Sequence, residues 1–305
     1  MNDWFMLGVT MWTAADIPDQ HGRTAIVTGA NTGIGYETAR ALAARGATVV
    51  LACRDAGRSE AARQRLRAAV PGAAVRTVPL DLAALASVRA AADEIRDRYE
   101  RIDLLINNAG ITGLGGHTAD GAEIQFGVNH LGHFALTGRL ADLLAPGARV
   151  VTVSSIGHRF GRIEDSGKPC GTSAYADSKL ANLLFTYELD HRLRAAGRPV
   201  AALAAHPGGA STEVFRYSPP WFRVPNLAVA RLFGRTPAMG ALPTLRAATD
   251  PAARGGEYYG PGGLFEIRGH PAIVKSSARA RDRRLRAALW EHSVEFTGVH
   301  TFGAA

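Results

Sequence analysis

Apolar, β-branched runs alternate with alanine-rich stretches along most of the chain. Most of the runs are apolar at consecutive positions, which is typical of strands buried on both faces of a sheet. They lie at residues 24–30, 47–53, 74–82, 102–110, 148–155 and 199–208. The stretches between them have helical composition and spacing, and the first ends at Gly46. This alternation predicts an α/β fold: a doubly wound parallel sheet, covered by helices on both sides, that binds ligands at the carboxyl ends of its strands.

The alternation stops between about Glu213 and Pro243, where proline and aromatic residues accumulate. We expect this segment, which we call the lid, to be an excursion over the sheet edge. We predict one domain over residues 22–305, with the lid at about 213–243, because no repeat or low-complexity linker divides the chain. Residues 1–21 form an N-terminal extension that either packs on the domain or frays. Its apolar stretch, residues 4–12, lacks a basic flank and is too short to cross a bilayer.

Composition narrows the class of protein. The chain has 305 residues, of which 47% are hydrophobic and 20% charged, so it can bury a large core. Its two cysteines, Cys53 and Cys170, lie far apart, and no metal-ligand spacing surrounds either of them. We therefore predict a cytoplasmic location, no disulfide framework and no metal.

The net charge of +8 raises the question of a nucleic-acid partner. The arginines are scattered, however. Their densest run, residues 279–290, is spaced like one solvated helix face, with Leu285, Leu289 and Trp290 on the other side. We predict no nucleic-acid binding and an electrostatic preference for polyanionic cofactors. Membrane association is not expected, because no continuous amphipathic span is evident.

The first predicted strand leads directly into "TGANTGIG", residues 28–35, so that Gly29, Gly33 and Gly35 fall at the turn into a helix. Glycines let the backbone approach a pyrophosphate closely, and the helix N-terminus offers free N–H groups and a favourable dipole. A tight turn is the plainer interpretation of a glycine triplet. The strand-turn-helix context favours a dinucleotide site.

The end of the second predicted strand distinguishes between two dinucleotides. NAD sites place an acidic residue there, which accepts hydrogen bonds from the ribose diol. This chain has Cys53 at that place, followed by Arg54, and a guanidinium binds a ribose phosphate through bidentate, charge-assisted hydrogen bonds. The sequence therefore favours NADP(H) over NAD(H). In the alternative, Arg54 points to solvent and Asp55 takes the role of the acid.

The motifs "TGANTGIG", "NNAG", "VNHLGHF", "SS", "YADSK" and "HPG" follow one another in the order and approximate spacing of the short-chain dehydrogenase/reductase family. The resemblance covers roughly residues 22–212 and implies a Rossmann-type fold and an oxidoreductase. The stretches "CRD", "VNHLGHFALT" and "SKLANLLFTYEL" most resemble the retinol-dehydrogenase-like branch of that family.

Tyr175 and Lys179, in "YADSK", lie one helical turn apart. Reduction of a carbonyl by a nicotinamide needs a proton donor at the developing alkoxide. A phenol suits that role if its pKa is lowered, and a lysine ammonium on the same helix face favours the phenolate. We therefore predict that Tyr175 is the general acid/base and that Lys179 tunes it. The family also implies that Lys179 holds the nicotinamide ribose. Without the other motifs, such a pair would more often be an exposed helix face.

Ser155 and Asn129 complete the predicted catalytic set. Ser154 and Ser155 end a strand on the ligand side of the sheet, and alignment with the family assigns the hydrogen bond to the substrate oxygen to Ser155. Asn129 matches the asparagine that in the family supports the lysine through a water; an asparagine that breaks and caps a helix is compatible with this role. The neighbouring His130 and His133 could indicate a metal, but no third ligand has suitable spacing, so helix packing is favoured.

Further cofactor contacts follow from positions in the family's motifs. They are Asn31, Thr32 and Ile34 in the glycine-rich turn, Asp81 and Leu82 beside the adenine, Asn108, Ala109 and Gly110 at the sheet edge, and Pro207, Gly208 and Thr212 beside the nicotinamide. His206, which precedes this last group, fits the retinol-dehydrogenase-like branch.

The predicted lid contains Phe215, Tyr217, Trp221, Phe222 and Phe233, which indicate a lipophilic ketone, aldehyde or alcohol as substrate. The same aromatic residues could instead pack against the domain, against a partner subunit in a homo-oligomer, or on a membrane surface. The leading hypothesis is an NADP-dependent oxidoreductase. One alternative is a dinucleotide-binding regulator or scaffold without turnover, which the intact catalytic set disfavours. Another is a sugar-nucleotide epimerase, which ordinarily needs a larger C-terminal domain.

Overall fold

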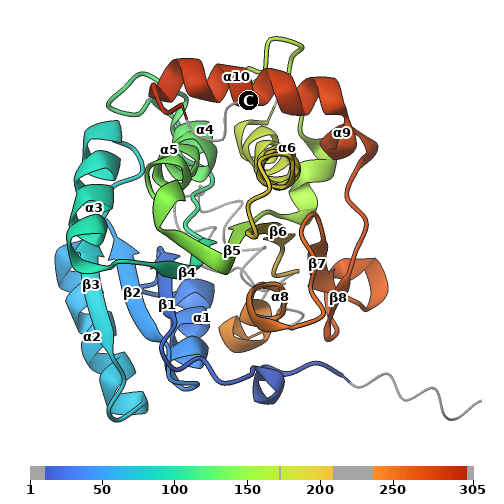
Figure 1. Cartoon of the computed structure of the whole chain (residues 1–305). Coiled ribbons are helices and arrows are strands. Elements are labelled where there is room, and N and C mark those ends of the chain that lie inside the picture. Colours follow the sequence, from blue (N-terminus) through green and yellow to red (C-terminus); the bar gives the residue numbers. More distant parts are fainter. Residues whose placement is uncertain (1–10, 172, 209–235, 301–305) are drawn as a thin grey trace, which may run out of the picture.

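The computed structural model describes residues 11–171, 173–208 and 236–300. Its centre is one sheet with the strand order β3-β2-β1-β4-β5-β6-β7-β8 (Figure 1). Strands β1 to β7 are parallel and β8 is antiparallel to β7. The strands are β1 (Thr24–Thr28), β2 (Thr48–Cys53), β3 (Val75–Pro79), β4 (Ile102–Asn107), β5 (Leu144–Val153), β6 (Ala201–Ala205), β7 (Tyr258–Pro261) and β8 (Pro271–Ile273). The strand order reverses between β1 and β4, and this arrangement confirms the predicted doubly wound Rossmann-type fold.

Five of the six predicted strands end two or three residues earlier than expected, and three of them show where the chain goes instead. β1 ends at Thr28, β4 at Asn107 and β6 at Ala205, so that residues 29–30, 108–110 and 206–208 are turns that lead away from the sheet. The last two strands were not predicted at all. β7 and β8 contain only "YYGP" and "PAI", which are too short to show a period.

Helices cover both faces of the sheet (Figure 1). On one face lie α1 (Gly33–Ala43), α2 (Ala56–Ala69) and α8 (Pro237–Thr249); on the other lie α3 (Leu85–Arg98), α5 (Gly132–Arg139) and α6 (Ala174–Ala195). The shorter elements are η1 (Ala14–Asp16), α4 (Ile124–Phe126), η2 (Gly127–Leu131), η3 (Ala141–Leu143), η4 (Ile156–Phe160) and η6 (Leu264–Glu266). The six longer helices each bury apolar residues.

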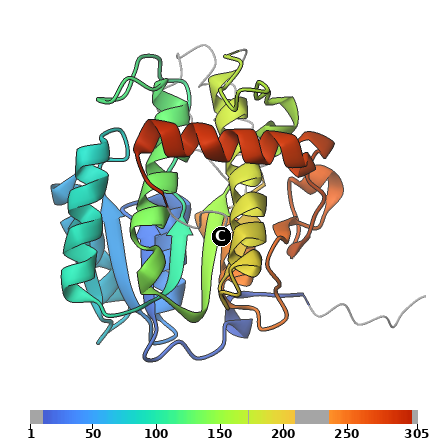
Figure 2. The ribbon, with the colours of Figure 1, turned by 45° about the horizontal axis from the view of Figure 1, so that its top comes forward.

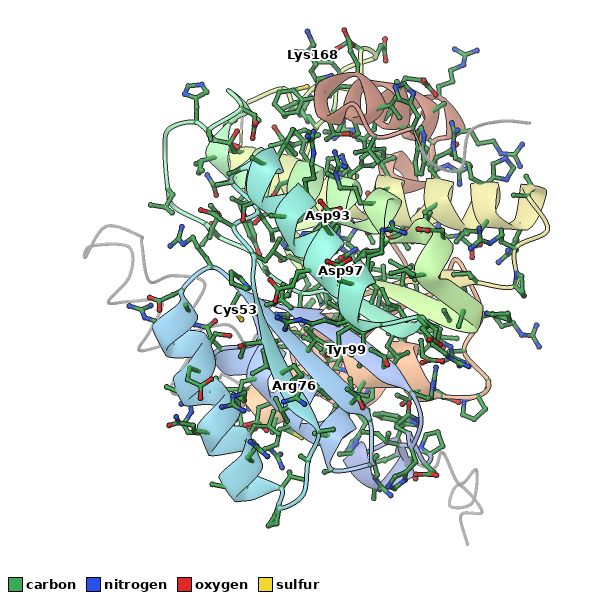
Figure 3. The ribbon with its side chains drawn as sticks, turned by 60° about the vertical axis from the view of Figure 1, so that its left-hand side comes forward. Cys53, Arg76, Asp93, Asp97, Tyr99 and Lys168 are labelled. Atoms are coloured by element: carbon green, nitrogen blue, oxygen red, sulfur yellow. The ribbon has the colours of Figure 1, made fainter. Side chains whose placement is uncertain are left out.

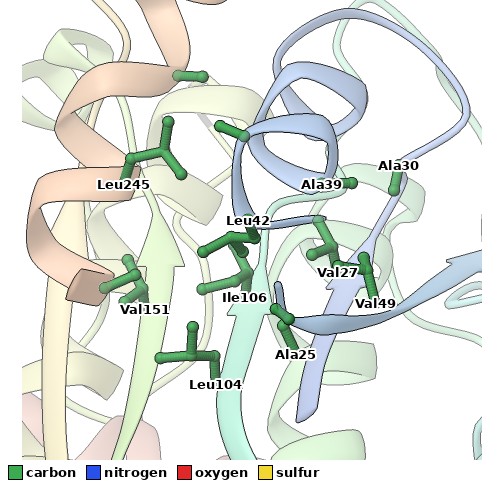
Figure 4. Packing of buried hydrophobic residues seen from close by; sticks show 14 of the residues in the cluster. Ala25, Val27, Ala30, Ala39, Leu42, Val49, Leu104, Ile106, Val151 and Leu245 are labelled. Atoms are coloured by element: carbon green, nitrogen blue, oxygen red, sulfur yellow. The ribbon is translucent and has the colours of Figure 1, made fainter. Parts of the chain in front are cut away.

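The core between the sheet and α1 and α8 consists of aliphatic side chains (Figure 4). Val27 and Ile106 come from the sheet, Leu42 from α1 and Leu245 from α8, and all four are buried. Burying one such side chain contributes about 1.5 to 3 kcal/mol. This packing fixes α1 and α8 against the central strands.

Helix α3 shows why the sequence pattern located the helices well. Val88, Ala92 and Ile95 recur at helical spacing and are buried against the sheet. Asp93 and Asp97 lie on the outer face of the helix, in solvent (Figure 3). This division between apolar and charged positions is what an amphipathic surface helix requires.

The basic run near the C-terminus forms two helices rather than the single predicted one. These are α9 (Ala278–Arg281) and α10 (Arg283–Thr297). Asp282 separates them because its carboxylate accepts hydrogen bonds from the backbone N–H groups of Arg284 and Leu285, at 2.8 and 3.3 Å. Leu289 and Trp290 are buried, as expected.

Helix α10 crosses the outer side of α5 and α6 (Figures 1 and 2). The ring of Trp290 lies 5.0 Å from that of Phe134 in α5 and 6.1 Å from that of Phe185 in α6. His130 Nε2 lies 2.8 Å from Ser293 Oγ, and Ser293 Oγ donates to Leu289 O. Helix α10 therefore completes the core on this face of the molecule.

The described part of the N-terminal extension packs on the domain. Trp12 and Ile17 are buried in the same cluster as the inner side of α1. Thr13 and Asp16 cap η1 reciprocally, and Arg45 donates to Ala14 O. Of the two alternatives for this segment, packing holds for residues 11–21.

Residues 237–243, at the end of the predicted lid, belong to helix α8. The aromatic residues predicted for the lid lie outside the described residues, as does Thr212. Over the ranges that the structure describes, every helix is too short or too polar to cross a bilayer.

Candidate active site

A cavity of about 450 Å³ lies over the carboxyl ends of the central strands, where the strand order reverses. Most of the predicted site residues line it: Gly29, Asn31, Thr32, Gly33, Ile34, Gly35, Arg54, Asp81, Leu82, Asn108, Ala109, Gly110, Ser155, Tyr175, Lys179, Pro207 and Gly208. Asn129 is buried behind this lining. The sheet order thus brings motifs from distant parts of the chain together in one place.

The glycine-rich turn needs glycine for two separate reasons. Gly29 and Gly33 have φ angles of 64° and 59°, a left-handed conformation that side chains disfavour. A Cβ atom on Gly35 would lie 2.4 Å from Asn108 Nδ2 and 2.5 Å from Gly29 O. Helix α1 therefore starts in close contact with the strand ends, with its unpaired first-turn N–H groups beside the cavity.

Thr28 ties the ends of β1 and β4 together below this turn. Its Oγ1 accepts hydrogen bonds from the backbone N–H groups of Asn108 and Ala109, both at 2.9 Å. Asn108 Nδ2 donates in return to Thr28 O at 2.8 Å. The first asparagine of "NNAG", Asn107, donates to Thr137 Oγ1 in α5. These bonds fix the floor of the cavity.

Asn129 lies in η2, which is a π-helical turn, a form that occurs frequently at functional sites. Its Oδ1 accepts from the N–H of Ile111 at 2.8 Å, and its Nδ2 donates to Ile111 O and to Ser178 Oγ, at 3.0 and 2.9 Å. His133 Nδ1 lies 3.0 Å from Asn129 O. Burial lowers the pKa of His133 to about 4, so the neutral ring donates from Nδ1 and presents Nε2 to Thr28 Oγ1.

Tyr175 and Lys179 both line the cavity from α6. Lys179 is buried; its Nζ donates to Val153 O at 3.0 Å and lies 5.7 Å from the centre of the Tyr175 ring. Burial lowers the pKa of Lys179 to about 8. Burial raises the pKa of Tyr175, and a hydrogen bond with Ser155 lowers it by less. Lys179 was expected to lower the pKa of the phenol. The net shift of this pKa is upward instead, because burial has the largest effect.

Ser155 follows β5 and caps η4, with its Oγ accepting from the N–H of Gly157 at 3.1 Å. A Cβ atom on Gly157 would lie 3.4 Å from both Ser155 Oγ and Tyr175 Cε1, so the two side chains converge beside this glycine. Ser154 is buried, and its Oγ donates to Lys179 O at 2.8 Å. Both serines line the cavity, but their hydroxyls differ: that of Ser155 lies beside Tyr175, whereas that of Ser154 is hydrogen-bonded to the backbone of α6.

His158 positions Ser155 through a hydrogen bond to its backbone carbonyl. It was not among the predicted site residues. Its Nδ1 donates to Ser155 O at 2.7 Å, and its Nε2 accepts from the N–H of Ser277 at 3.0 Å. Burial lowers the pKa of His158 to about 4, so the ring is neutral and can make both bonds at once. The only signal in the sequence was a histidine three residues after the serine.

At the end of β2 the cavity is lined by Cys53, Arg54, Asp55 and Arg58 (Figure 3 labels Cys53). The pKa of the buried Cys53 thiol is raised by burial. Asp55 caps α2: it accepts from the N–H of Arg58 at 2.9 Å, and its carboxylate lies 3.5 Å from Arg58 Nε. Arg58 was missed because it lies in a basic helix where nothing in the sequence distinguishes one arginine from the next.

Several apolar residues that line the same cavity were also missed, among them Leu114, Ile124 and Val128. From sequence they resemble ordinary core residues, because an apolar side chain has the same pattern whether it faces the core or a ligand. They give this part of the cavity a non-polar wall.

His130 takes part in packing, the interpretation that the sequence favoured. It is fully buried among aromatic rings, 5.1 Å from that of Phe126 and 5.9 Å from that of Phe185. Burial lowers its pKa to about 3. In the part of the chain that the structure describes, no three His, Cys, Asp or Glu side chains form a possible metal site.

The chain matches the short chain dehydrogenase family model over residues 23–222. Retinol dehydrogenase 12 of Mus musculus is 39% identical over 97% of this chain and 92% of its own length. The chain belongs to the short-chain dehydrogenase/reductase family, whose members are oxidoreductases that use a nicotinamide dinucleotide to interconvert carbonyls and alcohols. Within this family it belongs to the retinol-dehydrogenase-like branch, which confirms the resemblance found in the sequence motifs.

Solved structures agree with this assignment. A putative uncharacterized protein from Mycobacterium paratuberculosis is 42% identical, with a TM-score of 0.78, and the match covers 96% of this chain and 99% of that one. The RhlG/NADP active-site complex of Pseudomonas aeruginosa is 27% identical, with a TM-score of 0.62 over 79% of this chain and 94% of that one. A short-chain dehydrogenase/reductase from Burkholderia phymatum in complex with NAD is 26% identical, with a TM-score of 0.58 over 75% and 86%.

Proposed function

We propose that this protein is an NADP-dependent oxidoreductase that interconverts a carbonyl and an alcohol on a lipophilic substrate. The observation that carries the proposal is that Ser155, Tyr175 and Lys179 converge in the same cavity as Arg54 and Arg58. The residues fit a nicotinamide dinucleotide, because the glycine-rich turn and the start of α1 line the cavity, where their backbone can approach a pyrophosphate.

Tyr175 acts as the general acid in reduction and as the base in oxidation. When bound, the nicotinamide supplies or accepts the hydride. The raised pKa keeps the phenol protonated at neutral pH, so Tyr175 Oη can donate its proton to the substrate oxygen. Ser155 hydrogen-bonds the same oxygen. Lys179, with a pKa of about 8, carries a positive charge at neutral pH and stabilises the phenolate that remains.

Asn129 supports the lysine. A Cβ atom on Gly110 would lie 3.2 Å from Lys179 Nζ and 3.4 Å from Asn129 Oδ1, so both polar groups lie close to the same glycine. We propose that a water links them and replenishes the proton of Tyr175, as the family implies. Tyr175 and Lys179 also hold the nicotinamide ribose in this proposal.

The preference for NADP rests on the end of β2. Arg54 and Arg58 offer two guanidiniums to a ribose phosphate, and charge-assisted bonds to phosphate are among the strong ones. Asp55 already accepts the N–H of Arg58 as the cap of α2, which leaves it less suited to a ribose diol. The structure of this turn therefore supports NADP(H) over NAD(H).

The lipophilic substrate is supported by the apolar wall of Leu114, Ile124 and Val128. We also propose that residues 22–305 form one catalytic domain with a lid at about 213–243 and an extension over residues 1–21. The single sheet, which includes strands from β1 to β8, supports one domain. A cytoplasmic location and a homo-oligomer remain part of the proposal.

Replacement of Tyr175 by Phe tests the function. The wild-type protein should oxidise NADPH with at least one member of a panel of retinal, steroid ketones, aliphatic aldehydes and quinones. Tyr175→Phe should lower kcat by about 100- to 10,000-fold, the usual contribution of a positioned general acid. NADPH affinity, measured by protein fluorescence, should hardly change.

Tyr187→Phe is the matched control, since Tyr187 lies on the same helix and hydrogen-bonds Ser276 rather than facing the cavity. It should keep full turnover. Full activity of Tyr175→Phe would remove this tyrosine from the mechanism. Tight NADPH binding with no turnover on any substrate would favour a catalytically silent regulator or scaffold instead.

A further inference from the structure

A second hollow, of about 380 Å³, lies at the opposite end of the sheet, at the amino ends of the central strands. Arg23 precedes β1, Arg101 precedes β4, and Arg149 lies in β5 beside Leu104. All three arginines line the hollow. The proposed reaction uses none of them.

The carboxylates in this lining already have partners. Asp103 is buried, forms an ion pair with Arg101 and accepts from the N–H of Thr24 at 2.8 Å. Asp19 pairs with Nδ1 of His21. Asp103 also attracts Arg23, but its ion pair is with Arg101, so three arginines of the hollow face two carboxylates.

Arg23 and Arg149 are half-buried, and neither forms an ion pair with a carboxylate of the described residues. Arg23 Nη1 donates to Gln20 Oε1 at 2.9 Å, and Arg149 Nη1 donates to Ala247 O at 3.1 Å. Both acceptors are neutral. Burial lowers the pKa of each arginine, and the charge of Arg23 lowers that of Arg149 further. Two guanidiniums thus repel each other in a partly desolvated place.

The carboxylates that attract Arg149 from further away are also engaged. Asp250 accepts from Arg246 Nε at 3.0 Å, and Glu257 accepts from Tyr259 Oη at 2.6 Å. Half-buried like charges that outnumber the neighbouring carboxylates are costly, and a bound anion is the simplest way to compensate the excess.

We propose that this hollow binds a small doubly charged oxyanion, either inorganic phosphate or the phosphate group of a phosphomonoester, between Arg23 and Arg149. The planar fork of a guanidinium matches the oxygens of phosphate, and two such groups match its charge. The bound anion would link Arg23, which precedes β1, with Arg149 in β5. Because Arg149 also donates to Ala247 O, it would connect these strands with the end of α8. The site is distinct from the cofactor cavity, because it lies at the other end of the strands.

Calorimetric titration of the NADPH-saturated protein tests the site. Inorganic phosphate is added in one arm and glycerol phosphate in the other, both at constant ionic strength with chloride as the replaced ion. Saturating NADPH keeps phosphate away from Arg54 and Arg58. We expect saturable binding in at least one arm, and tighter binding of glycerol phosphate would identify phosphomonoesters as the ligand class.

Arg23→Gln and Arg149→Gln should each weaken the binding by about tenfold or more, because each removes a charged hydrogen-bond donor to the anion. Arg284→Gln removes the same charge from an exposed position in α10 and should leave it unchanged. NADPH affinity and the far-UV circular dichroism spectrum report whether each variant is folded; if one does not fold, the other carries the test.

Two results would overturn the proposal. One is the absence of saturable binding to the NADPH-saturated protein, including the case in which phosphate binds only without NADPH, since that places the ion in the cofactor cavity. The other is equal phosphate affinity in the wild type, Arg23→Gln, Arg149→Gln and Arg284→Gln, which would show a general response to net charge.

Discussion

Arg54 and Arg58 line the cofactor cavity on either side of Asp55, which caps α2. Arg54→Asp removes a phosphate partner and supplies an acceptor for a ribose diol. NADPH affinity should fall by about 10- to 100-fold, which corresponds to the loss of about 1.5 to 3 kcal/mol from hydrogen bonds to a charged group, while NADH affinity should rise or stay constant. Fluorescence titration with both cofactors measures the ratio.

Arg67→Asp provides the matched comparison, since Arg67 is exposed on α2 away from the cavity lining. It makes the same change in net charge and should leave the NADPH/NADH ratio as it is in the wild type. An unchanged ratio in Arg54→Asp would mean that another residue recognises the phosphate.

Individual site residues could be predicted where a motif fixes their positions, as it does for Tyr175 and Lys179. Their ionisation could not. The pKa of Tyr175 depends on how deeply the ring is buried, and that depends on the packing of the whole domain. His158 and Arg58 escaped prediction for a related reason: their roles come from contacts that residue type and spacing do not encode.

The contact between helix α1 and the strand ends depends on Gly35. In Gly35→Ala the added Cβ would meet Asn108 Nδ2 and Gly29 O at 2.4 and 2.5 Å, so α1 must move outward. We expect a loss of about 1 to 3 kcal/mol in the free energy of unfolding, as for other overpacked sites, together with weaker cofactor binding. Urea denaturation and fluorescence titration measure the two effects.

Gly115→Ala is the control for this substitution, because a Cβ there would contact nothing within 4 Å and the residue has no positive φ. It should change stability and cofactor affinity very little. If Gly35→Ala were as stable as Gly115→Ala and bound cofactor equally well, the close approach of α1 would not matter.

Elements with a clear period, such as α3, were predicted within a few residues, whereas short elements and element ends were not. β7 and β8 have too few residues to show a pattern. The break between α9 and α10 depends on one side chain, that of Asp282, which accepts backbone N–H groups instead of continuing the helix. Such local competition between side chain and backbone is weakly visible in sequence.

Buried histidines make the stability of the whole molecule depend on pH. Burial lowers the pKa of His130 to about 3 and that of His133 to about 4, whereas an unfolded histidine titrates near 6.5. Below about pH 6.5 the unfolded chain binds protons that the native state does not bind. The free energy of unfolding should therefore be highest above this pH and fall as the pH decreases, by up to about 1.4 kcal/mol per pH unit for each histidine.

Urea denaturation between about pH 7 and pH 5 measures this slope. In His130→Gln the slope should become shallower by the contribution of one histidine, and the side-chain amide can still donate to Ser293. His117→Gln, at an exposed position, should keep the wild-type slope. If the free energy of unfolding had the same pH slope in the wild type, His130→Gln and His117→Gln, His130 would not be the group that resists protonation.

The sequence does not predict which helices α10 packs against. Trp290 was expected on the apolar side of a helix, but nothing local indicates that its partners are Phe134 and Phe185, far earlier in the chain. Contacts of this kind depend on the final arrangement of all the helices around the sheet. Local periods predict the fold class and the longer elements, but not these contacts between distant parts of the chain.

The position of α10 has a consequence for biosynthesis. Helices α5 and α6 leave the ribosome well before Trp290 and Ser293, the residues that cover their outer side. Until α10 is made, Phe134 and Phe185 remain uncovered on a nearly complete domain. Exposed apolar surface on an incomplete chain promotes aggregation. The nascent protein therefore exposes these rings from the synthesis of α6 until α10 is made and docks.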